Sequence, residues 1–325
     1  KTKSDTEILF NVLKKFKNDI KEGLNLLDGM FAFAFYDKKS NVLILGRDRF
    51  GVKPLYYSFI GDALVFGSEI KSLKEYVGKL KVNHRAVMNF LVNRSFDYSE
   101  ETFFEKIYQV KQSSFLEFHL SEGGAPEQKE KKYWDLSFVE KRNYNDEKSV
   151  IEEFRNLFLN AVSIRLRSDV PVAALLSGGL DSSAVVAAVA SPKALNNKIT
   201  TFSAVYKNDP LDERHFAESL VKQYKNINPV WVEIEQNDFF DVLEKTIYHQ
   251  ETPIADGSMV AHFLLMKKIN ENGTKVVLTG QGGDEILGGY VQTFLPADSA
   301  DKIRNLNFEN FSRKYLFHSM PSYVK

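Results

Sequence analysis

Apolar and polar residues follow two different patterns along this chain, and the change between them divides the sequence into two regions. From Lys1 to about Tyr133, apolar residues at helical spacing in 8–16 precede short strand-like segments with two-residue alternation. Turn residues at 37–41 and 61–62 join these segments into hairpins, and the glycine- and proline-containing stretch 121–126 predicts a hairpin tip. We therefore expect an α+β fold of antiparallel sheets with helices. The expected strands are 30–36, 42–45, 55–60 and 63–66.

The second region alternates short apolar runs with amphipathic helical patterns, which is typical of βαβ units in a parallel sheet flanked by helices. We place the first domain at 1–134, a charged linker at 135–148 and an α/β domain at 149–325. The expected helices of the second domain are 150–165, 182–190, 213–224, 239–249 and 261–270, and its expected strands are 172–176, 199–205, 229–234 and 275–278.

A glycine-rich loop, called here the first glycine loop, connects a buried strand to a helix. A strand that ends at two glycines and continues as a helix points backbone N–H groups and a positive helix end at one place, which suits phosphate. The loop lacks the Gly-Lys-Ser/Thr of a Walker A sequence, so its amides and serines must hold the phosphate, and Asp181 requires a bridging cation. This combination predicts binding of the pyrophosphate that a nucleotide releases. The loop consists of Ser177, Gly178, Gly179, Leu180, Asp181, Ser182 and Ser183.

A second glycine loop, residues 279–290, follows the expected strand 275–278. Loops after parallel strands emerge at one edge of the sheet, so we expect Asp181 and Asp284 to share one Mg²⁺ over the phosphates. The segment from Gly280 is a poor dinucleotide fingerprint, because Glu285 stands where that motif needs its last glycine. The two loops together therefore favour a nucleotide site.

With both regions considered, the chain resembles the glutamine-hydrolysing asparagine synthetases over essentially its whole length. The first region is similar to the later part of that family's class II glutaminase domain, an Ntn-hydrolase type of fold. The second region is similar to its synthetase domain, a PP-loop ATP pyrophosphatase with a HUP-like sheet. The motifs that carry the resemblance are 4–7, 27–34, 47–57 and 68–71 in the first region and 177–183, 212–213 and 280–290 in the second.

The resemblance implies an ATP-dependent carbon–nitrogen ligase. Aspartate would be adenylated with release of pyrophosphate, and ammonia derived from glutamine would then give asparagine and AMP, with ATP and Mg²⁺ required. By resemblance, Asp181 and Asp284 hold magnesium and Asp5 receives the amino group of glutamine. The positions that correspond to the adenosine site are Leu175, Ala204, Thr279 and Gly280.

Gln281 departs from the family pattern, whose best-known members carry a glutamate there that is assigned to the ammonia proton. Glutamine has no basic carboxylate, so either water or another group takes the ammonia proton, or the substrate that accepts the amine is different. Two alternatives therefore stay open. One is a ligase acting on another carboxylate, such as a β-lactam synthetase relative or an enzyme that amidates peptides or cell surfaces. The other is an inactive scaffold that kept the fold.

The ends of the chain also bear on the expected activity. By resemblance, the family's N-terminal cysteine nucleophile lies before Lys1, and a later helical region with a catalytic lysine lies after Lys325. We expect an internal fragment that does not hydrolyse glutamine by that route. A naturally short, ammonia-using homologue is the alternative.

Composition excludes several classes of partner. Lys plus Arg and Asp plus Glu are 43 each in 325 residues, so no net field attracts nucleic acid or an anionic membrane. No apolar run approaches the length of a membrane span, and cysteine is absent, which excludes disulfides and thiolate metal sites. We expect a cytoplasmic protein with small-molecule substrates, and a homodimer is an open alternative.

Overall fold

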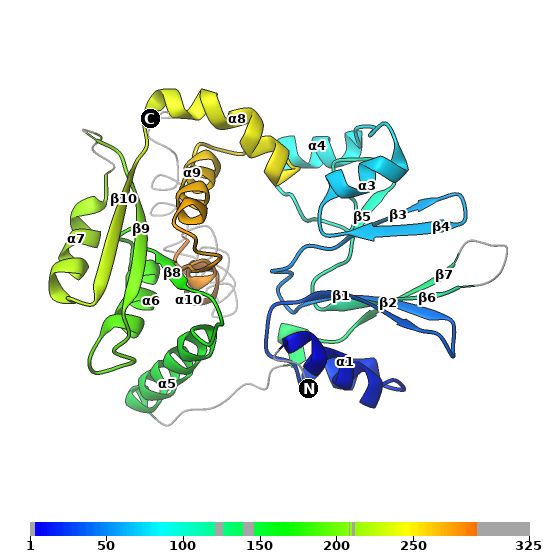
Figure 1. The fold of residues 1–325 in the computed structure, drawn as a ribbon, viewed down its shortest axis with the longest axis horizontal. Helices are drawn as coiled ribbons and strands as arrows, with labels where there is room; N and C mark the ends of the chain where they lie inside the picture. The colour runs from blue at the N-terminus through cyan, green and yellow to red at the C-terminus, as the bar shows by residue number, and fades with distance from the viewer. Residues whose placement is uncertain (1–3, 121–125, 139–145, 208, 210–211, 291–325) are drawn as a thin grey trace, which may run out of the picture. The chain divides into compact units, whose positions relative to one another are not determined.

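The computed structural model describes residues 4–120, 126–138, 146–207, 209 and 212–290 (Figure 1). The chain divides into two compact units that are not continuous in sequence. Unit 1 comprises Lys1–Asn143 together with Glu244–Ala255, and unit 2 comprises Tyr144–Leu243 and Asp256–Lys325. A segment from the second half of the sequence therefore belongs to the first unit, which periodicity alone does not indicate.

Unit 1 contains two antiparallel sheets, as the alternating pattern predicts. A four-stranded sheet has the order β1 (Ala32–Asp37), β2 (Val42–Arg47), β6 (Ser114–His119) and β7 (Glu127–Lys132). A three-stranded sheet has the order β4 (Ala63–Gly67), β3 (Tyr56–Ile60) and β5 (Ile107–Gln109). Both expected hairpins are present, with Asp37 opposite Val42 and Ile60 opposite Ala63. His119 pairs with Glu127, so 121–126 does join two hairpin strands, although 121–125 lie outside the described residues.

Helices of unit 1 pack against both sheets. They are α1 (Asp5–Lys15), α2 (Ile20–Asn25), α3 (Ile70–Val77) and α4 (His84–Asn93), with a short 3₁₀ turn at Leu136–Phe138. Only α1 is predicted from the sequence. Ser4 caps it by accepting a hydrogen bond from the Thr6 amide, and Leu13 on its inner face packs in one core with Leu24 and Phe115. The sequence analysis does not predict α2, α3 and α4, which have 6, 8 and 10 residues.

Unit 2 is a parallel sheet with helices on both faces, as predicted. The strand order is β10 (Ile227–Glu233), β9 (Ile199–Val205), β8 (Val172–Leu175) and β11 (Val276–Leu278). All three pairings are parallel. Its helices in the described residues are α5 (Glu147–Arg165), α6 (Leu180–Ala190), α7 (Arg214–Gln223), α9 (Ser258–Glu271) and α10 (Gly283–Leu287). Helix α8 (Gln236–Gln250) begins in unit 2, and its residues from Glu244 onward belong to unit 1.

The two faces of this sheet have separate cores. On one face, Leu176 packs with Val162 of α5, Val186 of α6 and Ala217 of α7. On the other face, Phe202 packs with Leu265 and Ile269 of α9. Burial on both faces explains why the central strands are continuous apolar runs without alternation. In the described part of the chain, no helix has the length and apolar character needed to cross a membrane.

Candidate functional site

The two glycine loops follow neighbouring strands of unit 2. Strands β8 and β11 pair in parallel, with Val172 opposite Val276, so their carboxyl ends reach the same edge of the sheet. The first glycine loop follows β8 and the second follows β11. In an open parallel sheet this edge is where ligands bind. The expected placement of both loops at one edge is confirmed.

The first glycine loop is held in a conformation that only glycine accepts easily. Gly178 has φ +100°, and a Cβ there would lie 2.8 Å from the carbonyl oxygen of Glu213. Gly179 is the N-cap residue of α6 and makes no side-chain capping bond, so the N-cap residue supplies no side-chain acceptor to the first amides of that helix. Such amides can bind an anion. Leu180, at the start of α6, is 84% exposed.

The serines of this loop bond to the loop itself. The buried Ser182 hydroxyl lies 2.9 Å from the Ser177 hydroxyl, accepts from the Ser177 amide and donates to the Gly179 carbonyl, both at 3.2 Å. Ser177 Oγ also accepts a hydrogen bond from the Gly179 amide at 3.2 Å. The hydroxyls therefore fix the shape of the loop. Ser183 lies half-buried in the first turn of α6, and direct phosphate contacts by these serines stay a prediction.

The two glycine loops touch each other. A Cβ at Gly280 would lie 2.6 Å from the amide nitrogen of Ser182 and 2.9 Å from the carbonyl carbon of Asp181. A Cβ at Gly283 would overlap the Asp181 carboxylate. Glycine at these two positions is what allows the second loop to lie directly against Asp181.

Part of the second glycine loop is helical, which the sequence analysis does not anticipate. Helix α10 starts after Gly282 and ends at Gly288, and both glycines are left-handed, with φ +94° and +72°. Glycine tolerates this conformation, so it can both start and stop a single turn. Asp284 and Glu285 occupy the first turn of α10, where the helix dipole favours acidic residues.

Acidic side chains from both loops gather near Tyr290. The pKa of Tyr290 is raised, first by the charge of Glu285, then by desolvation and by the charges of Asp284 and Asp181. The Asp284 carboxylate lies against Gly289. The site therefore brings Asp181 and Asp284 into one negatively charged environment.

The chemistry of these two carboxylates is compatible with Mg²⁺ that is bound together with a substrate phosphate, as the sequence analysis predicts. Among the described residues, no group of three or more His, Cys, Asp or Glu side chains forms a metal cluster. Mg²⁺ does not need one, because it is commonly held by one or two carboxylates together with substrate phosphates and water. Hard oxygen donors beside a helix N-terminus are the appropriate donor set for a magnesium–nucleotide complex.

The residues matched to the adenosine site lie beside the loops. Leu175 and Ala204 are half-buried and both pack against the core of Ala173 and Phe202. Thr279 is exposed at the end of β11, and its hydroxyl accepts a hydrogen bond from the Gln281 amide at 3.4 Å. Gln281 itself is exposed. Their roles stay predictions, although all of them lie at the carboxyl edge of the sheet.

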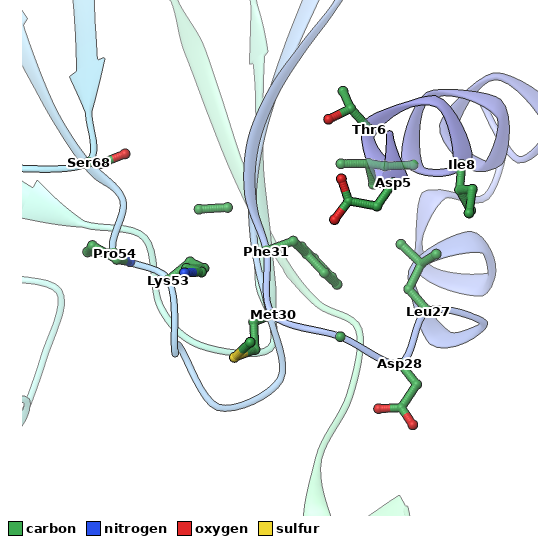
Figure 2. Close-up of a pocket in the computed structure, with 13 residues that line it drawn as sticks. Asp5, Thr6, Ile8, Leu27, Asp28, Met30, Phe31, Lys53, Pro54 and Ser68 are labelled. Carbon is green, nitrogen blue, oxygen red and sulfur yellow. The ribbon is translucent and has the colours of Figure 1, made fainter. Parts of the chain in front are cut away.

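Unit 1 contains a separate pocket of about 570 Å³ that includes Asp5. Figure 2 shows Asp5 and Thr6 on the helix side of this pocket and Lys53, Pro54 and Ser68 on the opposite side. A carboxylate and an ammonium group facing one pocket suit a zwitterionic ligand such as an amino acid. The sequence analysis identifies Asp5 by resemblance but does not identify Ser68 as a lining residue.

Asp48 holds the loop that carries Lys53. Its carboxylate is 1% exposed and accepts hydrogen bonds from four backbone amides. The donors are the amides of Phe31, Phe50, Val52 and Lys53, at 2.9 to 3.2 Å. Two of these donors, Phe31 and Lys53, belong to residues that line the pocket. This buried carboxylate therefore fixes one wall of the pocket. The motif 47–57 marks the segment but does not show that Asp48 organises it.

The fold and the loops define a two-part protein: an antiparallel α+β unit with a pocket that contains Asp5, and a parallel α/β unit with two glycine loops at one edge of its sheet. Comparison with known families agrees. The family model "asparagine synthase" matches residues 153–322, and the model "glutamine amidotransferase domain" matches residues 1–134. The chain belongs to the asparagine synthase family.

Relatives cover nearly all of the chain but are themselves longer. The chain is 34% identical over 311 residues to putative asparagine synthetase [glutamine-hydrolyzing] 2 of Methanocaldococcus jannaschii, covering 94% of this chain and 57% of the relative. It is 31% identical to asparagine synthetase [glutamine-hydrolyzing] 1 of Bacillus subtilis, covering 89% and 43%. It is 28% identical to amidase chyE of Penicillium rubens, covering 88% and 43%. The chain thus spans about half the length of these relatives.

Proposed function

We propose that the chain contributes residues to two sites of an ATP-dependent amidating ligase that uses glutamine as its nitrogen donor. These are the glutamine pocket of unit 1 and the nucleotide site of unit 2. The reaction would be that of an asparagine synthetase: aspartate is adenylated, pyrophosphate leaves, and ammonia displaces AMP. The observation that carries the proposal is the contact between Asp181 and residues 280–283, which puts two acidic loops and the N-terminus of α6 at one sheet edge.

Each group has a distinct task in this proposal. The first amides of α6 bind the β- and γ-phosphates, and Asp181 with Asp284 would hold Mg²⁺, which neutralises negative charge on the departing pyrophosphate. Leu175, Ala204, Thr279 and Gly280 line the adenosine position. Gln281 lies where the amine approaches. Asp5 accepts the amino group of glutamine in the pocket of unit 1.

Product analysis tests the reaction class. ATP labelled in the adenine ring is incubated with the intact protein, Mg²⁺, aspartate and glutamine or ammonium. Attack at the α-phosphorus predicts AMP and pyrophosphate in equal amounts, dependent on the acceptor. Formation of ADP and phosphate would contradict the proposal.

A second candidate differs only in the acceptor. Gln281 stands at the position where the family's best-known members carry glutamate, and a relative with another name, amidase chyE, is 28% identical to this chain over 300 residues. A carboxylate other than aspartate is therefore the runner-up. Pyrophosphate release measured across a panel of amino-acid, peptide and β-amino carboxylates separates the two: release only with aspartate supports the first candidate.

A further inference from the structure

A residue from the sequence of the synthetase part is built into the fold of unit 1. Glu251 directly follows α8, and the segment Glu244–Ala255 belongs to unit 1. Its carboxylate accepts hydrogen bonds from the backbone amides of Ile70 at 2.7 Å and Lys71 at 2.6 Å. The side chain of Glu251 is only 9% exposed. Glu251 also has φ +58°, an uncommon backbone conformation for a non-glycine residue.

These contacts replace a missing cap on α3. The N-cap residue of α3, Glu69, makes no side-chain capping bond, and the first turn contains no acidic residue. The first amides of a helix need acceptors, and a negative charge there interacts favourably with the helix dipole. Glu251 supplies both the hydrogen-bond acceptors and the negative charge, although it lies 180 residues from Lys71 in the chain.

A second hydrogen bond also connects the segment to α3, because Lys71 Nζ donates to the Tyr248 carbonyl at 3.4 Å. Lys71 Nζ lies 3.5 Å from Glu251 and 3.1 Å from Glu69, and 4.9 Å from the centre of the Tyr248 ring. Beside these groups is a mostly apolar cavity of about 440 Å³, lined by residues that include Ile247 and Phe104. The two hydrogen bonds from backbone amides to Glu251 are therefore one defined part of this attachment.

The start of α3 leads directly into the pocket that contains Asp5. Ser68, which lines that pocket, is two residues before the first helical residue, Ile70. The turn is compact, because the Ser72 hydroxyl donates to the Glu69 carbonyl at 2.6 Å and a Cβ at Gly67 would overlap Ser72. A shift of the first turn of α3 would therefore move Ser68.

We propose that Glu251 is a positioning residue for the amide-donor pocket: its carboxylate holds the first turn of α3 and thereby the Ser68 wall. The role of the pocket rests on the proposed function. Residues 251–258 continue into α9, then β11 and the second glycine loop, so the residue that shapes the glutamine pocket is covalently linked to the nucleotide loop. Glu251 lies within the asparagine synthase match, whereas the pocket lies within the glutamine amidotransferase match.

Hydrogen exchange and ligand titration on the chain test this role. Glu251→Ala removes both acceptors, and Glu251→Gln keeps one acceptor with nearly the same shape. Glu69→Gln is the matched control, because Glu69 also pairs with Lys71 but caps no amide. Since hydrogen bonds to charged groups are the stronger ones, Glu251→Ala should speed exchange of the Ile70 and Lys71 amides and weaken glutamine binding by about tenfold or more.

The expected pattern separates positioning from general stability. Glu251→Gln should give an intermediate effect, Glu69→Gln should stay within about twofold of the unsubstituted chain, and ATP affinity should be unchanged in all three. Unchanged exchange or unchanged glutamine affinity in Glu251→Ala would overturn the inference, as would an equal effect of Glu69→Gln or a parallel loss of ATP affinity. Lack of ATP binding by the unsubstituted chain would instead overturn the proposed function, while the exchange result would still decide the role of Glu251.

Discussion

Three glycines set how closely the two glycine loops approach each other and α7. Gly178 takes φ +100° directly against the backbone of Glu213, and Gly280 and Gly283 both lie against Asp181. Each would place a Cβ within 3 Å of another atom, a spacing that real side chains essentially do not show. The sequence motifs name these glycines, but only the three-dimensional contacts show which neighbour each one accommodates.

Replacing Gly280 should therefore separate the loops. In Gly280→Ala the new methyl group meets the backbone of Ser182 and Asp181, which cannot rotate away as a side chain can, so overpacking should cost about 1–3 kcal/mol. ATP affinity should fall with it, measured by titration calorimetry. Gly257→Ala is the control, because the nearest atom to its Cβ is 3.8 Å away. Equal ATP affinity in the two variants would show that the loop contact is not needed for binding.

Helix ends differ in how much of their stabilisation is local. Helix α1 is capped by the adjacent Ser4 and is predictable from sequence, whereas α3 depends on Glu251, for which no local pattern exists. The sequence does not predict α10, because its single turn is bounded by left-handed glycines, which a loop would also contain. It does predict β8 and β11, because burial on both faces produces apolar runs. Long-range capping and glycine conformations are therefore what sequence periodicity cannot supply.

The start of α5 should depend on pH through Asp146. The Asp146 side chain accepts from the Ser149 hydroxyl and amide, which lowers the pKa of this carboxyl below its ordinary value of 3.8. A lowered folded-state pKa means that the cap stabilises α5 above the unfolded value and that this contribution is lost as pH falls through the folded pKa.

Amide exchange of the first turn of α5 between about pH 2 and pH 5, corrected for intrinsic rates, measures this effect, with protection decreasing below about pH 4. Asp146→Asn still accepts a hydrogen bond but does not titrate, so its protection should be nearly independent of pH in that window. The same acid-dependent loss in both proteins would assign the change to another group.

At the scale of the whole molecule, the sequence identifies both regions, and the structure adds that one segment of the second region belongs to unit 1. The motifs at 4–7, 47–57 and 177–183 all lie in the units expected for them, with Asp5 in a pocket and Asp181 at the sheet edge. The return of Glu244–Ala255 to unit 1 could not be foreseen, because neither its composition nor its spacing differs from an ordinary helix and loop. The boundaries at 134 and 149 and the individual roles of the site residues stay predictions.

Magnesium-dependent ATP binding is the most direct test of the central claim, that Asp181 and Asp284 join a nucleotide to the first glycine loop. Calorimetric titration with ATP is done with and without Mg²⁺ on the chain, on Asp181→Asn and Asp284→Asn, and on the exposed control Glu271→Gln. The account predicts Mg²⁺-dependent binding that pyrophosphate competes for, weakened at least about tenfold by either aspartate substitution and unchanged in the control. An ATP affinity that is the same with and without Mg²⁺, or that is unchanged in Asp181→Asn, would contradict the account.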